Sequence, residues 1–161
     1  MDVMKKFYSV KLSNKKITGG IKKTKWPARL QFISKNALID CAHNPAGFNA
    51  LAKELRIIKQ KNKFKKIIFV VGILRDKNIK EMLRIISPLA SFVIFTRPNS
   101  KRAAEPSYLF KTFKGIYKNK KIIKIKLIKK PKKALEHARK IMKRGDFIVI
   151  TGSIYLAGEF V

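Results

Sequence analysis

The chain has 161 residues, of which 46% are apolar and 10% aromatic, as in a folded domain and unlike a disordered segment. No apolar run approaches the roughly 20 residues of a membrane-spanning helix, and one cysteine excludes an internal disulfide framework. We therefore expect a cytoplasmic protein without membrane contacts, although lysine and arginine total 39 against 9 acidic residues, a net charge of +30.

This charge has two interpretations, a nucleic-acid-binding surface or a general bias of the sequence toward lysine. Arginine, the better reader of bases and phosphates, is a small minority of the cations, and lysines occur in every segment instead of marking one motif. We therefore favour the lysine bias and do not expect nucleic acid as a partner. A basic nucleic-acid-binding module on the same fold stays open as the alternative.

In chain order, the first expected elements are a lead-in and a hairpin. Residues 1–25 are predicted to be a basic lead-in, either mobile or a short helix, ahead of a folded domain over residues 26–161. Two short apolar runs, 30–33 and 37–40, are joined by a three-residue polar turn. Runs of this length and spacing predict a β-hairpin.

The first two helices of the domain carry clear start signals. Asn44 is a good N-cap and Pro45 a good first helical residue, with apolar residues following on one helical face. Asn78 can cap the next helix, and Glu81 is placed to reach back to it as in a capping box. We expect helices to begin at both asparagines.

From there on, apolar runs of strand length alternate with amphipathic helical patterns. Further helices are expected to start at Pro106 and Pro131, and strands are expected at 67–73, 92–96, 122–128 and 147–151. The run 122–128 alternates apolar residues with lysine, which is typical of an edge strand with one wet face. The alternation predicts an α/β, Rossmann-like fold with a mostly parallel sheet flanked by helices on both faces.

Side chains that could carry chemistry follow four of the predicted strands. They are Asp40 and His43, then Gly72 and Asp76, then Thr96, Arg97 and Arg102, and last Thr151, Gly152 and Ser153. In an open parallel sheet, ligands bind beyond the carboxyl ends of the strands. A helix start at Asn44 adds free backbone N–H groups and a positive dipole, which suit phosphate or carboxylate.

Each of these residues has a structural alternative. Asp40 either bonds local backbone or accepts from a ribose hydroxyl or an ammonium, and His43 either bonds backbone or contacts a base or substrate carboxylate. Arg29, next to the rigid Trp26-Pro27 pair, is either an exposed arginine or a phosphate ligand. We assign no catalytic residue and no metal site, since two histidines and one cysteine make zinc binding a poor explanation.

Four motifs, taken together and in order, resemble a known family. They are Trp26–Leu30, Asp40–Pro45, Val71–Lys77 and Thr151–Gly158. They resemble the C-terminal domain of the folylpolyglutamate synthase/dihydrofolate synthase family, in the Mur ligase superfamily, from about Leu12 to Val161. The resemblance implies a Rossmann-like α/β domain, in agreement with the fold predicted from the residues.

The resemblance also implies an activity. Members of the family use ATP and magnesium to phosphorylate a dihydropteroate or folate carboxylate, which the amine of L-glutamate then attacks. By similarity, Arg29 and Asp40 would contact ATP, while His43 and Ser153 would hold glutamate or shape its pocket. ATP, L-glutamate and dihydropteroate or folate are therefore the expected ligands.

The family's N-terminal ATPase domain, with its phosphate-binding loop and magnesium ligands, has no counterpart in this sequence. The resemblance therefore implies a separately encoded ATPase half that holds the magnesium, with residues 1–25 as the remnant of a linker; a nonfunctional gene fragment is the alternative.

Two positions where the family usually has glycine are Ala28 and Cys41 here. We expect β-region backbone at both, which tolerates a Cβ.

Overall fold

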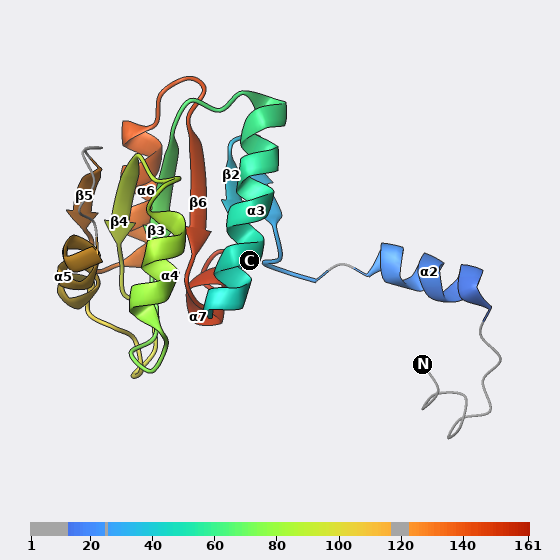
Figure 1. The fold of residues 1–161 in the computed structure, drawn as a ribbon, viewed down its shortest axis with the longest axis horizontal. Helices are drawn as coiled ribbons and strands as arrows, with labels where there is room; N and C mark the ends of the chain where they lie inside the picture. Colours follow the sequence, from blue (N-terminus) through green and yellow to red (C-terminus); the bar gives the residue numbers. More distant parts are fainter. Residues whose placement is uncertain (1–12, 25, 117–122) are drawn as a thin grey trace.

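The computed structural model describes residues 13–24, 26–116 and 123–161, which contain one six-stranded sheet with helices on both faces (Figure 1). The strands are β1 (Gln31–Ser34), β2 (Ala37–Ile39), β3 (Ile67–Val71), β4 (Phe92–Phe95), β5 (Lys124–Leu127) and β6 (Phe147–Thr151). Their order is β1-β2-β6-β3-β4-β5, with β1 antiparallel to β2 and every other pair parallel. The predicted Rossmann-like sheet with an N-terminal hairpin is confirmed.

Burial explains why the strands have these sequences. Every residue of β3 and β6 is buried, because both faces of the central strands are covered; β3 is accordingly a continuous apolar run, and β6 is apolar up to Thr151 at its end. β5 lies at the edge and exposes Lys124 and Lys126, as its alternating pattern predicts, but Leu127, which the pattern places on the inward face, is exposed as well. Ile122, where we expected this strand to begin, lies outside the described residues.

The helices form two layers around the sheet. They are α2 (Asn14–Lys23), α3 (Pro45–Asn62), α4 (Ile79–Ile86), α5 (Pro106–Ile116), α6 (Pro131–Ile141) and the short α7 (Ile154–Ala157). Helices α3, α4 and α5 cover one face, α6 and α7 cover the other, and α2 projects away from the sheet (Figure 1). None of the helices in the described ranges has the length and apolarity to cross a membrane.

The predicted helix starts at Asn44 and Asn78 are confirmed. The side chain of Asn44 accepts a hydrogen bond from the backbone N–H of Gly47 at 2.8 Å, and that of Asn78 accepts one from Glu81 at 3.2 Å. The reciprocal half of the capping box is wrong, because the Glu81 carboxylate accepts a hydrogen bond from Arg84 at 3.0 Å instead. Arg84 lies one helical turn further along the exposed side of α4, where such pairs form readily.

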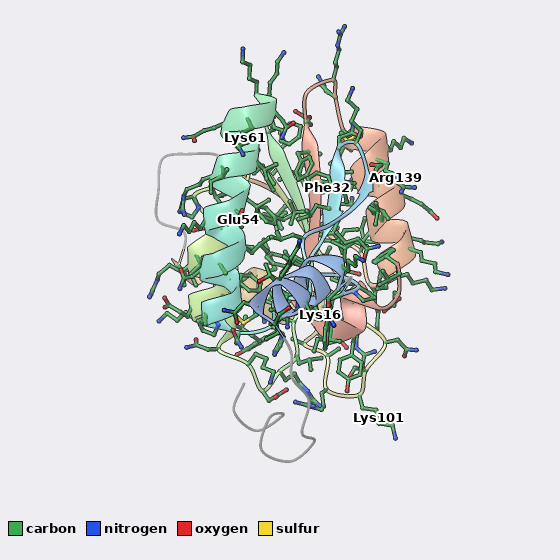
Figure 2. The ribbon with its side chains drawn as sticks, turned by 90° about the vertical axis from the view of Figure 1, so that its right-hand side faces the viewer. Lys16, Phe32, Glu54, Lys61, Lys101 and Arg139 are labelled. Carbon is green, nitrogen blue, oxygen red and sulfur yellow. The ribbon has the colours of Figure 1, made fainter. Side chains whose placement is uncertain are left out.

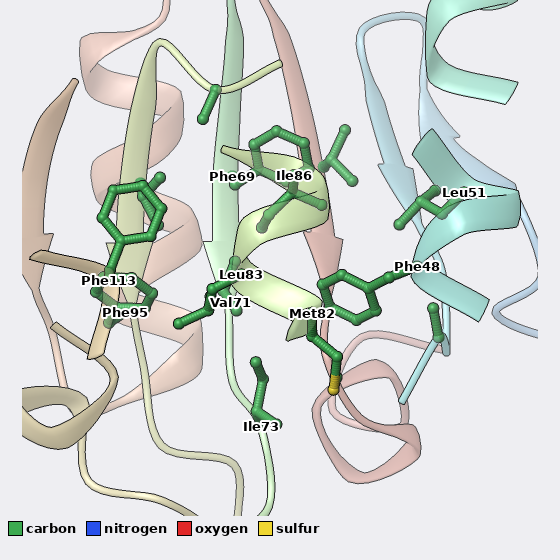
Figure 3. Close-up of a cluster of buried hydrophobic side chains, with 14 of the residues drawn as sticks. Phe48, Leu51, Phe69, Val71, Ile73, Met82, Leu83, Ile86, Phe95 and Phe113 are labelled. Carbon is green, nitrogen blue, oxygen red and sulfur yellow. The ribbon is translucent and has the colours of Figure 1, made fainter. Parts of the chain in front are cut away.

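Two apolar clusters fill the space between sheet and helices. The larger one lies under α3, α4 and α5, and Figure 3 shows its aromatic rings, among them Phe48, Phe69, Phe95 and Phe113, between these helices and the sheet. The smaller one lies between the sheet and α6 with α7. Because both faces of the central strands are dry, polar chemistry in this domain is confined to the ends of the strands.

Candidate functional site

Four loops meet at the carboxyl edge of the parallel strands and are tied together by backbone hydrogen bonds. The N–H of Asp40, after β2, donates to Ile150 of β6 at 2.9 Å, and Gly72, after β3, donates to Thr151 at 3.2 Å. The loops after β3 and β4 also pair, through an isolated antiparallel bridge between Leu74 and Ala103. These loops carry the residues that the sequence placed at the strand ends, so the predicted clustering at one edge is confirmed.

The hairpin brings Arg29 to the same edge as Asp40. Because β1 runs antiparallel to β2, the start of β1 lies beside the end of β2, and the carbonyl of Ala28 accepts a hydrogen bond from the N–H of Cys41 at 2.7 Å. Arg29, Asp40 and His43 line one cavity of about 400 Å³ together with the first turns of α3. The structure thus assembles three of the four predicted ligand-binding residues around a single space.

Asp40 organises the backbone of this cavity. Its Oδ2 accepts a hydrogen bond from the N–H of Leu30 at 3.0 Å, and its Oδ1 accepts one from Ala42 at 2.9 Å. The first bond ties the end of β2 to the turn before β1, ten residues earlier in the chain. The interpretation of Asp40 as a residue that bonds local backbone is therefore confirmed; each carboxylate oxygen still has lone-pair capacity for a further donor.

His43 lies at the junction of two cavities. Its Nδ1 is 3.0 Å from the carbonyl oxygen of Cys41, and since a carbonyl only accepts, Nδ1 is the protonated nitrogen. In the neutral ring this leaves Nε2 with a free lone pair. His43 lines the 400 Å³ cavity and also a second cavity of about 250 Å³, whose other residues include Lys77, Arg102 and Ser153.

Ser153, the fourth predicted residue, lies in the second cavity and not in the first. Its side chain is fully buried and its Oγ accepts a hydrogen bond from the N–H of Leu156 at 3.0 Å, which caps α7. Lys77 and Tyr155 in this cavity were not singled out from the sequence. Both lie inside motifs that carry the family resemblance, so those motifs could have identified them as candidate site residues.

Arg29 is exposed, and its guanidinium lies 5.7 Å from the centre of the Trp26 ring. This is a cation–π distance, and Trp26 itself is 67% exposed. No carboxylate pairs with Arg29 in the described part of the chain. The guanidinium therefore keeps its charge available to an anion at the mouth of the first cavity.

The expected β-region backbone is wrong at Ala28, whose φ is 57°, in the left-handed region. Two hydrogen bonds hold the strained turn: the Ala28 N–H donates to Gln31 Oε1 at 2.7 Å, and the Ala28 carbonyl accepts from Cys41. These two bonds offset the cost of about 1–2 kcal/mol that a residue with a Cβ incurs in left-handed backbone. Cys41 is not among the described residues with positive φ, in keeping with the expectation for that position.

An ion pair holds the rim of the second cavity. The Asp76 carboxylate accepts a short hydrogen bond from Arg102, which lies in the loop after the next strand, and Lys77 Nζ lies 3.3 Å from the same carboxylate. The hydrogen bond from Arg102 holds the pKa of Asp76 below its usual value, and the same bond raises the pKa of Arg102. The pair joins the β3 and β4 loops, consistent with the bridge between Leu74 and Ala103.

This ion pair predicts an acid-sensitive contribution to stability. Because the pKa of Asp76 is lower in the folded state, its contribution is present above the unfolded-state value near 3.8 and disappears as pH falls through the folded-state value. We expect Asp76→Asn to unfold at a lower temperature than wild type at pH 7 and at the same temperature once Asp76 is protonated. Thermal unfolding followed by circular dichroism from neutral pH to below pH 3.8 measures this; a constant difference across that range would contradict it.

The described residues of the rim do not form a metal site. Within residues 13–24, 26–116 and 123–161, no three histidine, cysteine, aspartate or glutamate side chains gather closely enough to hold a metal ion. The basic side chains around the cavities are Arg29, Lys77 and Arg102, and the last two share the single carboxylate of Asp76, which leaves a net positive charge at the second cavity. Such a set suits anionic ligands rather than cations.

Comparison with known proteins agrees with the fold. A dihydrofolate synthase/folylpolyglutamate synthase of Buchnera aphidicola is 32% identical over 160 residues, covering 96% of this chain and 36% of the relative. A structure of Mycobacterium tuberculosis folylpolyglutamate synthase complexed with ADP is similar with a TM-score of 0.80 at 25% identity, covering 96% of this chain and 36% of that one.

A bifunctional folylpolyglutamate synthase/dihydrofolate synthase of Yersinia pestis, complexed with AMPPNP and Mn ion, shares the fold with a TM-score of 0.75 at 22% identity. It matches 93% of this chain and 34% of its own. The chain thus spans about a third of the length of these relatives. Residues 28–154, most of the chain, match the family described as Mur ligase, glutamate ligase domain, and the protein belongs to that family.

Proposed function

We propose that this chain is the C-terminal part of an ATP-dependent glutamate ligase, which adds L-glutamate to dihydropteroate or a folate. One observation supports this above the others: His43 lines both the cavity with Arg29 and Asp40 and the cavity with Ser153. A ligase of this kind brings an anionic nucleotide and an anionic amino acid to one reacting carboxylate. Two adjoining cavities, one with Arg29 at its mouth and the other with Lys77 and Arg102 in its lining, suit two such ligands.

The first cavity is the proposed nucleotide side. Arg29 has no carboxylate partner among the described residues, so its planar fork is free to bind two phosphate oxygens at once. Asp40, already bonded to two backbone N–H groups, accepts from a ribose hydroxyl with its remaining lone pairs. ATP, when bound, supplies the phosphoryl group that activates the substrate carboxylate.

The second cavity is the proposed glutamate side. Lys77 and Arg102 place positive charge at its rim, where the carboxylates of glutamate bind, and Ser153 shapes its buried end. At neutral pH the amino group of glutamate is an ammonium and must lose a proton before it attacks. The free lone pair of His43 Nε2, at the junction of the cavities, is the proposed acceptor, while the Nδ1–H bond to Cys41 holds the ring in place.

Catalysis is proposed to need an ATPase half as well as this domain. Phosphoryl transfer depends on a phosphate-binding loop and magnesium, and the relatives are about three times as long as this chain. We therefore propose that a separate ATPase half supplies both, and that this chain closes the nucleotide site from the other side with Arg29 and Asp40.

The experiment mixes this chain with the separately expressed ATPase half of a related folylpolyglutamate synthase and measures incorporation of labelled glutamate into dihydropteroate or tetrahydrofolate. We expect ATP-dependent incorporation above either half alone. Arg29→Ala should lower it about tenfold or more, the value of one lost charge-assisted contact. Arg139→Ala, which removes another exposed arginine, on α6, should leave it unchanged.

A second measurement separates the role of His43. Hydroxylamine traps the activated carboxylate without needing a base to deprotonate it, so His43→Gln should retain hydroxamate formation while losing glutamate addition. Raising the pH should restore part of that addition, because more glutamate is then already unprotonated. If the two halves are folded and associated but give neither hydroxamate nor glutamate addition, the chain is a nonfunctional fragment. If His43→Gln loses both reactions equally, only the proposed role of His43 as proton acceptor is contradicted, and the proposed ligase function stands.

A further inference from the structure

The end of the molecule opposite the candidate site carries a second, unassigned surface. We call this end, where the parallel strands begin, the amino edge; it is formed by residues 61–66 and 142–146. The two segments are side by side, since the N–H of Lys65 donates to Gly145 at 2.8 Å and that of Phe147 donates to Lys66 at 2.9 Å. The exposed basic side chains of this edge are Lys61, Lys63, Lys65, Lys66, Lys143 and Arg144.

Figure 2 shows long, nitrogen-tipped side chains extending from the end of the molecule where Lys61 lies. At the amino edge, within the described residues, the acidic side chain is that of Asp146, which is only 6% exposed and accepts a hydrogen bond from the N–H of Lys143 at 3.0 Å. The ion pairs within the described ranges all use Asp76, Glu81 or Glu105, so none neutralises a basic residue of this edge.

A uniform bias toward lysine does not account for this edge. Six of its eleven residues are basic, against 39 of 161 in the whole chain. The amino edge also has a cavity of about 420 Å³, which is lined by Lys66, Lys124 and Lys143 together with Ser91 and Asp146. An edge with this much uncompensated positive charge attracts a polyanion.

We propose that the amino edge binds the phosphate backbone of double-stranded nucleic acid, without reading its sequence. Duplexes carry one charge per about 1.7 Å, and binding is favoured by release of their condensed counterions. Lysine, a compact point charge, suits phosphates but lacks the planar fork that reads guanine. This inference does not depend on the proposed ligase function.

The same surface fits other polyanions less well. The exposed large apolar side chains of the described residues lie outside the two loops of the amino edge. Within the loops, Phe64 and Met142 are half-buried, and the Phe64 ring stacks on that of Phe147 with 4.2 Å between ring centres. The loops therefore offer no exposed ring on which the bases of a single strand would stack and no exposed apolar side chain that would enter a membrane. Contact with phosphate groups is the mode of binding that this surface supports, and it is strongest with a duplex because a duplex has the higher density of phosphate charge.

The test measures binding of short, random-sequence DNA and RNA duplexes to the full chain by fluorescence anisotropy, from about 50 to 200 mM salt. One variant carries Lys61→Gln, Lys66→Gln, Lys143→Gln and Arg144→Gln at the amino edge. Its control carries Lys53→Gln, Lys80→Gln, Lys132→Gln and Arg139→Gln, which are exposed on α3, α4 and α6. Both variants lose four positive charges, and circular dichroism checks that both are folded.

We expect the amino-edge variant to bind about tenfold more weakly or worse, with the slope of log K against log salt reduced by about 3 to 4. The control should keep most of the affinity and slope, and the DNA and RNA arms tell which duplex is preferred. Equal losses in both variants would assign the binding to a uniform lysine field and overturn the proposal. Absence of salt-sensitive binding, equal binding of single strands, or preference for anionic vesicles would also overturn it.

Discussion

Gly152→Ala is expected to lower the free energy of unfolding by about 3–5 kcal/mol, a large part of the stability of a domain this size. Gly152 has a φ of 119°, a conformation that side-chain-bearing residues rarely adopt. A Cβ there would lie 2.7 Å from the carbonyl oxygen of Gly72, which is backbone and has little freedom to move. Both glycines lie where the β3 and β6 loops approach each other, so the clash also disturbs the rim of the site.

Gly115→Ala is the matched control for this change. Gly115 lies near the end of α5, and a Cβ there meets no atom within 4 Å. The same added methyl should therefore stabilise the protein, by up to about 1 kcal/mol, through helix propensity. Urea unfolding of the two variants measures both effects, and a loss below about 1 kcal/mol in Gly152→Ala would show that the loops are not in tight contact.

Asp40→Ala is expected to cost about 2–4 kcal/mol of stability, because it removes the acceptor of two backbone hydrogen bonds at once. One of them, from Leu30, holds a turn in which Ala28 and Leu30 both have positive φ. Without the carboxylate this strained turn is free to relax, and Arg29, which it carries, leaves the cavity. Urea unfolding gives the loss, and nuclear magnetic resonance shifts of residues 26–31 report the released turn.

Asp40→Asn separates the two bonds. The asparagine amide keeps one oxygen acceptor, so one backbone hydrogen bond survives and about half of the loss is expected. Glu54→Ala is the control, because it removes a carboxylate of the same cavity that has no hydrogen bond or ion pair with the described residues. It should stay within about 0.5 kcal/mol of wild type. If Asp40→Ala were as stable as this control, the two hydrogen bonds would not be holding the turn.

The layers of the fold could be predicted because they depend on local patterns. Continuous apolar runs identify β3 and β6 as strands covered on both faces, and the asparagine caps fix where α3 and α4 begin. The gathering of Asp40, His43 and Ser153 at one edge follows from the same topology, since parallel strands all end on one side.

The details that were missed depend on contacts distant in sequence. The positive φ at Ala28 is held by the Cys41 N–H, and the role of Asp40 depends on Leu30, ten residues away. Neither partner can be identified before the hairpin register is known. The pairing of Asp76 with Arg102 likewise requires that the β3 and β4 loops lie side by side, although the sequence already placed both residues at strand ends.

The position of β6 has a consequence for synthesis of the protein. β6 is the last strand along the chain, yet it lies between β2 and β3 and hydrogen-bonds to both. Until residues 147–151 have left the ribosome, β2 and β3 each have one unpaired edge, and the sheet remains in two pieces, β1-β2 and β3-β4-β5. The domain therefore completes its folding only after translation of this segment, and a premature stop before it leaves a product with two open strand edges, prone to aggregate.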